Sequence, residues 1–419
     1  MRIRYGNVLW SSNRATRQVG PVDPSTALRL TRAMPAIDAP TGHGDSRLFR
    51  SITRPNWRIA LAGAAAIFAF GAAACGSGDV TPTPPPDTPI PATPTPSIPT
   101  RVPRPTQTPV PLPPPITIDG YLIETFGGIK TPGDLAFDGD NVWVTIVGDN
   151  TVSKLDNYGR IIATYPVGLT PRPIAFDGEF MWVGNNSVSS VTKLTLSGHE
   201  IGEFPVGGGY TSPAAMVSDG TNMWVVASWG NSLHKLAPDG EDLLSVAVPG
   251  NHPSPWAVTF DGNAIWLASL NLHTVDKISL DGDVLGSFPV GKRNVDYEGI
   301  GTDTGGQGPT ALAFDGTSVW IASNWLDLVT IMSTRGEVLK EIPVGAWPSG
   351  LVFDGESIWV SNFVDNTVTR LGLDGEEIVT LPVGKGPVSM VAAPASPGTN
   401  ASLWVVNTSE TTVSKITLP

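Results

Sequence analysis

The fold is decided by two adjacent stretches near the C-terminal end of the chain, PSGLVFDGESIWVSN (residues 348–362) and NTVTRLGLDGEEIVTLPVG (residues 366–384). They contain four short runs rich in Val, Ile, Thr, Phe and Trp, residue types that favour β-strands. Asp-Gly pairs, which are strong signals for tight hairpin turns, follow the first and third runs. Four antiparallel strands joined by hairpins within about 42 residues describe one blade of a β-propeller.

The same unit recurs along the chain, marked by tryptophans at matched positions: Trp143, Trp182, Trp224, Trp266, Trp320, Trp359 and Trp404. Innermost strands are expected to begin near seven residues: Asp134, Pro173, Ala214, Trp256, Thr310, Ser349 and Val388. Outermost strands are expected to begin near only six: Gly159, Gly198, Gly240, Gly282, Gly336 and Gly375. The last unit therefore lacks one strand.

The missing strand stands ahead of the first unit, where DGYLIETF (residues 119–126) matches the outer-strand pattern. Pairing this segment with the last unit would close the ring and remove its open edges. The sequence therefore predicts an all-β, seven-bladed β-propeller with four antiparallel strands per blade. Its last blade is expected to be closed by the N-terminal strand.

Three motifs carry a resemblance to known families: IWVSN (358–362), NTVT (366–369) and LPVG (381–384). They resemble the repeats of YVTN-type, surface-layer-like propellers and of the related NHL and streptogramin-lyase-like propellers. The resemblance extends over about residues 117–419. The resemblance implies the propeller architecture. Members of these families include surface-displayed binding proteins and a minority of metal-dependent enzymes.

The N-terminal segment has the order of a secretion signal. Residues 1–74 hold ten Lys and Arg against three Asp and Glu, and they end in the uncharged run Ile59–Ala74. A basic region, an apolar region and small residues before a cut are typical of an exported protein. The run Ala72-Ala73-Ala74-Cys75 resembles the lipobox of bacterial lipoproteins, with Ala72 where that family usually has leucine. We expect lipidation at Cys75 and a membrane-anchored chain facing outside the cytoplasm.

Between the signal and the repeats lies a segment that is unable to form a core. Residues 76–115 contain sixteen prolines and eight threonines, a composition that favours an extended, disordered chain. The domain organisation is therefore predicted as 1–74, basic segment and lipoprotein-type signal; 75–115, lipidated Cys75 and Pro/Thr-rich stalk; and 116–419, seven-bladed propeller.

Composition excludes several classes of function. A single cysteine excludes a disulfide framework and any Cys-based zinc or iron–sulfur site. The net charge is −12 for the whole chain and, after the +7 of residues 1–74 is removed, −19 for residues 75–419. Such a charge argues against a nucleic-acid partner. No catalytic motif, metal-ligand set or cofactor-binding motif stands out, and we expect a monomeric propeller.

The Asp-Gly hairpins vary little between blades, whereas the loops on the opposite face vary. We call that face, formed by the linkers between blades and the loops between second and third strands, the loop face. Aromatic and polar side chains on such loops are typical of a binding surface. The ligand-binding candidates are Arg172, Tyr210, Trp229, His252, His273, Trp325, Trp347 and Phe363, with Lys130 and Lys385 on the same loops. A long insertion, residues 292–308, is expected on this face.

An enzyme would need ligands at the central channel. The innermost strands contain apolar runs such as Leu135-Ala-Phe and Leu351-Val-Phe. His234, His252 and His273 occupy neighbouring blades, where Glu298 or Asp303 would complete a shared site. We therefore expect a module that binds a carbohydrate, peptide or protein through the loop face. The alternative is a metal-dependent propeller enzyme, lactonase-like or streptogramin-lyase-like.

Overall fold

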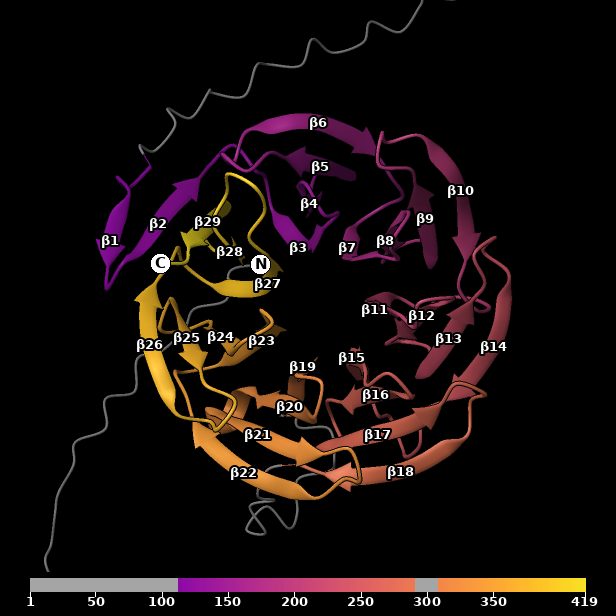
Figure 1. The fold of residues 1–419 in the computed structure, drawn as a ribbon. Helices are drawn as coiled ribbons and strands as arrows, with labels where there is room; N and C mark the ends of the chain where they lie inside the picture. The colour runs from indigo at the N-terminus through magenta and orange to yellow at the C-terminus, as the bar shows by residue number, and fades with distance from the viewer. Residues whose placement is uncertain (1–111, 291–307) are drawn as a thin grey trace, which may run out of the picture. The chain divides into compact units, whose positions relative to one another are not determined.

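The computed structural model describes residues 112–290 and 308–419. Cys75, the signal within 1–74, the stalk up to residue 111 and most of the 292–308 insertion, with Glu298 and Asp303, lie outside the described residues. The described chain forms seven antiparallel sheets arranged as blades around a central axis (Figure 1). The seven-bladed, all-β fold predicted from the repeats is confirmed.

Each blade contributes four strands, and the blades are numbered in chain order. The innermost strands are β3 (Pro132–Phe137), β7 (Pro171–Phe176), β11 (Pro213–Ser218), β15 (Pro255–Phe260), β19 (Pro309–Phe314), β23 (Pro348–Phe353) and β27 (Pro387–Ala393). The second strands are β4 (Val142–Ile146), β8 (Met181–Asn185), β12 (Met223–Ala227), β16 (Ala264–Ser269), β20 (Ser318–Ser323), β24 (Ile358–Asn362) and β28 (Ser402–Asn407).

The third strands are β5 (Thr151–Leu155), β9 (Ser190–Leu194), β13 (Ser232–Leu236), β17 (Thr274–Ser279), β21 (Leu328–Ser333), β25 (Thr367–Leu371) and β29 (Thr412–Thr417). The outermost strands are β6 (Ile161–Pro166), β10 (Glu200–Pro205), β14 (Asp242–Ala247), β18 (Val284–Pro289), β22 (Val338–Pro343), β26 (Glu377–Pro382) and, for blade 7, β2 (Tyr121–Phe126). A short 3-10 helix, η1 (Asn324–Leu326), connects β20 to β21.

The ring closes as the strand count predicts. In blade 7, β2 pairs with β29, with Leu122 opposite Thr417 and Phe126 opposite Val413. A further strand, β1 (Ile116–Ile118), pairs with the outer edge of β2 and makes this sheet five-stranded. The sequence pattern did not predict β1. Both ends of the described chain thus lie in blade 7 (Figure 1).

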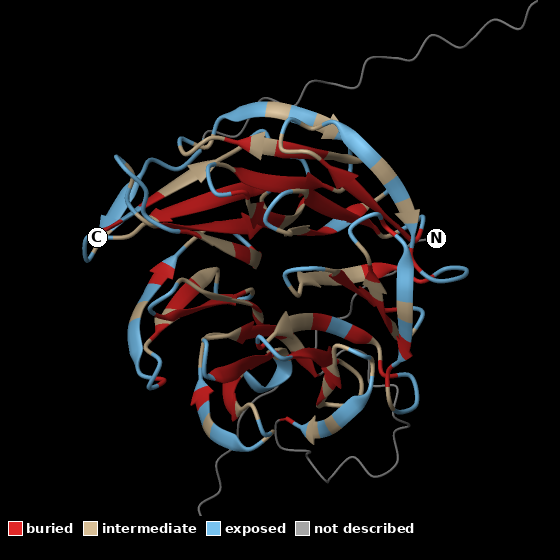
Figure 2. Cartoon of the chain, turned by 45° about the vertical axis from the view of Figure 1, so that its right-hand side comes forward, coloured by how far each residue is buried: buried red, intermediate tan, exposed pale blue. Residues whose placement is uncertain are grey.

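Burial decreases from the middle of each blade outward. Every residue of β4, β8, β12, β16, β20, β24 and β28 is buried, whereas β6, β10 and β18 alternate exposed and half-buried positions (Figure 2). The seven repeated tryptophans are at most 1% exposed and belong to the hydrophobic clusters between neighbouring sheets. The residues that mark the repeat in the sequence are therefore core residues.

A hydrogen bond ties each of these tryptophans, in blades 1 to 6, to the hairpin that precedes it. Each indole N–H donates to the carboxylate of the Asp-Gly turn five residues earlier, over 2.6–2.8 Å. The turn aspartate also accepts bonds from backbone N–H groups two and three residues after it. These aspartates therefore fix the turn and the core together, a second role that the turn chemistry alone does not predict.

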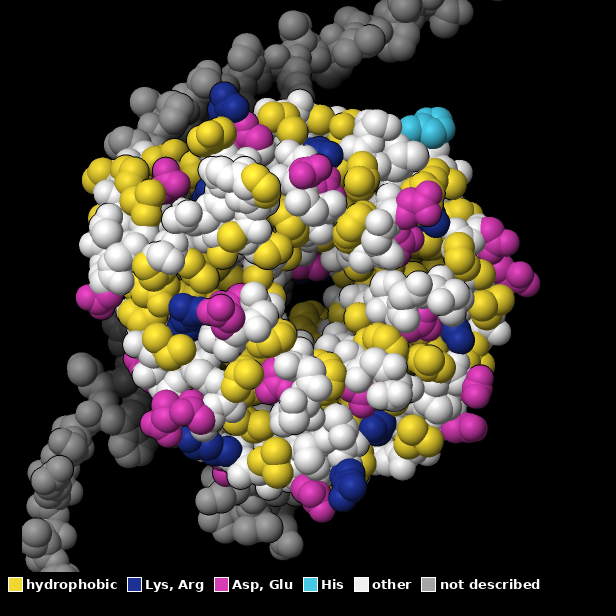
Figure 3. Space-filling model, in the orientation of Figure 1, with side chains coloured by type: hydrophobic (Ala, Val, Ile, Leu, Met, Phe, Trp, Pro, Cys, Tyr) yellow, Lys and Arg dark blue, Asp and Glu magenta, His cyan; other side chains and the backbone are white. Residues whose placement is uncertain are grey.

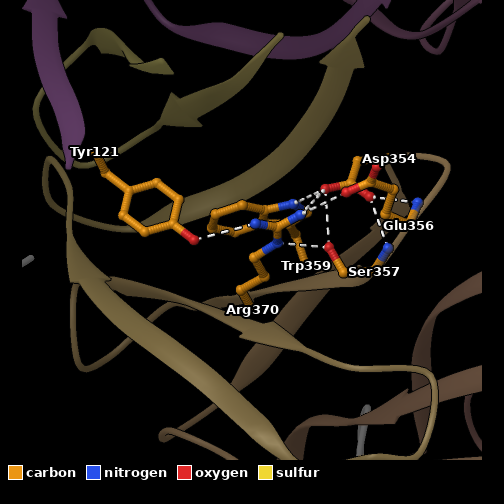
Figure 4. A network of polar contacts seen from close by, with 6 residues as sticks. All are labelled: Tyr121, Asp354, Glu356, Ser357, Trp359 and Arg370. Carbon is orange, nitrogen blue, oxygen red and sulfur yellow. Dashed lines mark hydrogen bonds and ion pairs between the residues drawn. The ribbon is translucent and has the colours of Figure 1, made fainter. Parts of the chain in front are cut away.

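A cation completes this arrangement eleven residues after the tryptophan in six of the seven blades. In blade 6, Arg370 lies over the ring of Trp359, with Cζ 5.4 Å from its centroid, and Nη2 lies 3.3 Å from Oδ2 of Asp354. Its Nε donates to Ser357, and its Nη1 donates over 3.1 Å to the hydroxyl of Tyr121 in blade 7 (Figure 4). The network thus joins adjacent blades.

In five other blades a lysine at the matching position joins its blade to the next one. For example, Lys154 Nζ in blade 1 donates to the carbonyl oxygen of Leu196 in blade 2, and Lys235 donates to that of Leu280 in blade 4. Ile331 occupies the matching position in blade 5. The contact between blades 5 and 6 is consequently apolar at this position, with Ile331 and Ile358 in one hydrophobic cluster.

The Pro-Val-Gly motif has a packing reason. A Cβ added to Gly345 would lie 2.6 Å from Cγ of Asn362, and one added to Gly384 would lie 2.7 Å from Cγ of Asn407. Only glycine allows the linker to approach the asparagine of the following blade this closely. Among the described residues, no helix is long and apolar enough to cross a membrane.

Candidate binding site at the channel mouth

The innermost strands and the linkers that lead into them enclose a cavity of about 1040 Å³ along the ring axis, which we call the channel cavity. Figure 3 shows the channel open at the centre of the ring, with hydrophobic side chains on its wall. All seven innermost strands begin at a proline, one or two residues before the start expected from the sequence. In each sheet the register shifts directly after this proline, as it does at a β-bulge.

The channel wall is less apolar than the sequence suggested. The residues one or two positions after the initial prolines include a carboxylate, a guanidinium group, an indole and hydroxyl groups. Those that line the cavity are Asp134, Arg172, Trp256, Thr310, Ser349 and Ser389. The expectation of apolar innermost strands holds for the later positions, such as Leu135, Ile174 and Leu312, which are buried or pack on the core. The polar groups stand at the first positions of the strands, before the apolar runs.

Asp134 joins three blades through its carboxyl group. Its Oδ1 accepts hydrogen bonds from Ser389 Oγ in blade 7 and from the backbone N–H of Leu135, at 2.8 Å for the latter. Its Oδ2 accepts from the backbone N–H of Ile174 in blade 2, at 3.1 Å. Burial raises the pKa of this carboxyl above its usual value, and the bonds from Ser389 and the two backbone groups only partly oppose that rise. The Asp134 carboxyl group is therefore held in a fixed position in the channel wall.

One aromatic pair stands on the loop face at blade 3. Trp229, in the loop between β12 and β13, is 72% exposed, and Tyr210 from the preceding linker packs edge-on against it with centroids 5.4 Å apart. Backbone bonds hold the two loops together, because Trp229 N donates to Thr211 O at 3.0 Å. Thr211 in turn donates its hydroxyl to Val206 O, which ties down the linker.

A second aromatic group stands at blades 5 and 6. Trp347 lies between Trp325 of η1 and Phe363 of the β24–β25 loop, with ring centroids 6.0 and 5.9 Å away. Phe363 N donates to Trp347 O at 3.0 Å, and Trp347 N donates to Oδ1 of Asp327 at 2.8 Å. The backbone of both loops is thereby fixed, so the exposed rings of Trp325 and Trp347 are held in place.

The structure brings most of the candidate residues together. Arg172, Trp229, Trp347 and Phe363 line the channel cavity. Tyr210 and Trp325 support that set by packing on Trp229 and Trp347.

The remaining candidates lie apart from that cavity. His252 lines a second cavity beside Trp229, and His273 is half-buried and lines neither cavity. Lys130 and Lys385 form exposed ion pairs with Asp149 and Glu410, each over 3.3 Å.

The histidines do not share a site. His234 is buried in the sheet of blade 3, where Nδ1 lies 2.8 Å from Oδ2 of Asp242 and Nε2 lies 2.9 Å from Ser232 Oγ. His252 is on the exposed linker before blade 4. Within residues 112–290 and 308–419, no three His, Cys, Asp or Glu side chains are grouped so as to hold a metal ion.

No protein-family model and no curated protein matches this sequence. Solved structures do match it. A streptogramin B lyase superposes with a TM-score of 0.59 at 18% identity, over 71% of this chain and 98% of that one. The protein has the fold of these lyase propellers. The resemblance inferred from the repeat motifs is thereby confirmed at the level of the fold.

Two further structures show how widely this propeller fold is used. A catalytically inactive variant of virginiamycin B lyase from Staphylococcus aureus, solved with quinupristin, matches with a TM-score of 0.59 at 17% identity, over 71% of this chain and 100% of that one. Hydrazine synthase of Kuenenia stuttgartiensis matches with a TM-score of 0.57 at 18% identity, over 70% and 96% of the two chains. At such identities the likeness establishes the propeller fold alone.

Proposed function

We propose that the propeller is a binding module that holds its ligand at the loop-face mouth of the channel, the ligand being a carbohydrate, a peptide or a segment of another protein. One observation carries this proposal: aromatic side chains from separate blades surround a single cavity. Trp229, Trp256 and Trp347 are 72%, 44% and 38% exposed, and all three line the channel cavity. Exposed aromatic groups gathered around a concave site are typical of ligand recognition.

The repeat strengthens this interpretation. Each blade already has its core tryptophan buried on the second strand, so the fold does not require the rings on the loops. These rings occupy positions where the repeats differ from one another, for example Trp256 where β11 has Ala214 and β3 has Gly133. Side chains that depart from the repeat and line a cavity support a role in binding.

We further propose that the module is exported and attached to the membrane by lipid on Cys75, with residues 76–115 as the spacer. The support is the basic segment, the uncharged run Ile59–Ala74 and the position of the chain's one cysteine directly after it. A Cys75→Ser variant is expected to remain unlipidated and to leave the membrane fraction. Full processing and membrane retention of that variant would contradict the anchor.

The positions of the histidines do not support the alternative, a metal-dependent enzyme. Of the histidines that such a site would use, His234 is bonded to Asp242 and Ser232 within a sheet, away from the channel cavity. No observation on the described residues favours a reaction over binding.

The binding proposal is tested with the purified full chain on printed oligosaccharide and peptide arrays, followed by calorimetric titration of the best ligand. Trp347→Ala is expected to weaken binding by about tenfold, since central aromatic residues dominate such interfaces. Tyr158→Ala is the control, because Tyr158 is an exposed aromatic residue that lies on the β5–β6 hairpin, outside the cavity. Equal losses in both variants, or no ligand on either array, would refute the proposal.

A further inference from the structure

We infer that a second cavity beside Trp229 is a subsite for a neutral sugar ring, which would make the ligand a carbohydrate. We call this cavity of about 460 Å³ the side pocket; it is lined by Ser228, Trp229, Asn231, His252, Ser254 and Asn271. The inference rests on the proposed binding function, because it names the ligand class of the same site. The volume of the side pocket lies within the usual range of small-molecule pockets, roughly 300–1,000 Å³.

Three loops of two blades frame the side pocket, and hydrogen bonds fix them to one another. Asn231 Oδ1, in the β12–β13 loop, accepts from the backbone N–H of Ser254 in the β14–β15 linker at 3.1 Å. Asn271 Nδ2, in the β16–β17 loop, donates to the carbonyl oxygen of His252 at 3.2 Å. The pocket walls are therefore preorganised, which lowers the entropy lost on binding.

The lining groups retain unused hydrogen-bonding capacity. Among the described residues, no partner is present for Asn231 Nδ2, Asn271 Oδ1, either ring nitrogen of His252, or the hydroxyls of Ser228 and Ser254. This set contains donors, acceptors and groups that do both. A sugar hydroxyl likewise donates one bond and accepts two, so a polyhydroxylated ring matches the set better than a purely donating or purely accepting ligand.

Charge narrows the ligand class further. No Lys, Arg, Asp or Glu lines the side pocket, although the described chain carries many elsewhere. Phosphate or carboxylate ligands are usually bound by Arg or by several backbone N–H groups, and cationic ligands are usually bound by carboxylates. The amide and hydroxyl groups that line the pocket instead favour an uncharged ligand.

The aromatic wall supplies the apolar half of sugar recognition. The Trp229 indole is 72% exposed and is buttressed by Tyr210, whose ring meets it at an interplanar angle of 84°. The face of an indole is electron-rich and attracts positively polarised hydrogens. A pyranose ring presents such C–H groups on one face and hydroxyls at its rim, which corresponds to a tryptophan wall beside polar side chains.

The two linkers that flank blade 3 are longer than most others and contribute residues around the side pocket. Most linkers between an outermost and the next innermost strand are short, as in 167–170, 344–347 and 383–386. The two that flank blade 3, residues 206–212 and 248–254, are each three residues longer. The longer linkers carry Tyr210 and His252, so the additions to the repeat form the aromatic support and one wall of the side pocket.

The side pocket adjoins the channel cavity, since Ser228 and Trp229 line both. A ligand with one ring in the side pocket would therefore extend toward Trp256 and Trp347. This geometry favours an oligosaccharide of at least two residues over a single sugar.

The test uses the purified full chain on an array of neutral, acidic and N-acetylated oligosaccharides beside a peptide array, with calorimetric titration of the best oligosaccharide. Trp229→Ala is expected to weaken oligosaccharide binding by about tenfold, and Trp229→Phe by much less. His252→Ala is expected to weaken it by about threefold to tenfold, whereas His252→Asn, which also tolerates the positive φ of 51° there, should largely retain it. Tyr158→Ala should bind as the wild type, and all variants should unfold at the wild-type temperature.

The outcomes separate this inference from the binding proposal. If a peptide binds and Trp347→Ala weakens it while Trp229→Ala and His252→Ala do not, the binding function stands and the sugar subsite is refuted. If an acidic oligosaccharide is preferred over all neutral ones, the assigned ligand class is wrong. If neither array yields a ligand, both proposals are refuted.

Discussion

The ammonium group of Lys415 donates two hydrogen bonds to Asn157, one to its backbone carbonyl oxygen at 2.6 Å and one to Oδ1 at 2.8 Å. Lys415 lies in β29 of blade 7 and Asn157 in the hairpin of blade 1. The same ammonium lies 5.4 Å from the ring centroid of Trp404. These contacts cross the junction between the last and first blades, which residues 127–131 also connect through the backbone.

Replacing this cation tests its contribution to the closed ring. Lys415→Met keeps an unbranched side chain over Trp404 but removes both bonds to Asn157. We expect the free energy of unfolding to fall by about 1.5 kcal/mol, the lower end for hydrogen bonds to charged groups. The lower end applies because burial lowers the Lys415 pKa and so already disfavours the ammonium, despite the opposing charges of Glu124 and Asp156. Urea unfolding measures the difference.

Lys385→Met is the control for that change, because the Lys385–Glu410 pair is exposed. Its unfolding free energy should remain within about 0.5 kcal/mol of the wild type. Equal stability of the two methionine variants would show that Lys415 does not stabilise the ring.

The turn aspartates predict a loss of stability in acid. Burial alone would raise their pKa values, but bonds from the tryptophan indole and backbone N–H groups outweigh it and lower the pKa of Asp138, Asp219, Asp261 and Asp354. The folded chain thus binds fewer protons than the unfolded chain. Their contribution is complete above the ordinary aspartate pKa of about 3.9 and is lost as the pH falls through the lowered values.

Urea titrations over a pH series check this. Asp261→Asn should reduce stability at neutral pH and make the acid loss shallower, since one of the titrating groups is gone. An unchanged acid profile in Asp261→Asn would contradict the role assigned to the turn carboxylates.

Asp276 in β17 predicts the opposite trend. Its side chain is fully buried, Ser269 Oγ donates to Oδ2 at 2.9 Å, and Oδ1 has no partner among the described residues. Burial raises its pKa, opposed in part by bonds from Ser287 and Ser269. The folded state therefore retains this proton at pH values where the unfolded state has lost it, so its contribution falls as the pH rises from about 3.9 through the raised pKa.

Asp276→Asn keeps the shape and the acceptor for Ser269 without the buried charge. We expect a higher unfolding temperature at neutral pH and a smaller difference from wild type in acid, measured by calorimetry. Asp281→Asn, on the exposed β17–β18 hairpin, should change neither. A destabilised Asp276→Asn variant at neutral pH would mean that the carboxylate is needed as an anion.

Trp256 in β15 separates binding from stability. Its side chain is 44% exposed in the channel cavity and belongs to none of the hydrophobic clusters. Trp256→Ala is expected to weaken binding of the array-selected ligand by about tenfold while leaving the unfolding temperature nearly unchanged. A drop in unfolding temperature as large as that of Trp266→Ala, which removes a core ring, would show that Trp256 is structural.

The fold was predictable because its determinants are local and repeated. Tryptophans such as Trp359 and turns such as Asp354-Gly355 recur in register, and the strand count alone assigns residues 119–126 to the last blade. β1 escaped prediction because Ile116–Ile118 follows a proline-rich segment and has no counterpart in the repeat. The spacing of five residues between a turn aspartate and its tryptophan is constant in the sequence. The hairpin turn alone explains the aspartate, so the spacing does not predict the hydrogen bond between the two side chains.

The channel was only partly predictable. Aligning the seven innermost strands on their initial proline would have revealed Asp134, Trp256 and Ser389 as departures from the repeat. Other relationships depend on ring closure, such as the bond between Ser389 and Asp134, which are 255 residues apart in sequence. The packing of Tyr210 on Trp229 likewise depends on linker length and blade curvature, which no local pattern encodes.

Pairing β2 with β29 also sets an order for assembly. Polypeptides are synthesised from the N-terminal end, so β2 (Tyr121–Phe126) exists long before its inner neighbour β29 (Thr412–Thr417) has been made. During that interval β1 is its only neighbour within the sheet, and β2 presents an open edge of backbone groups. The sheet of blade 7, and with it the closed ring, can therefore form only after the six residues of β29 have been made.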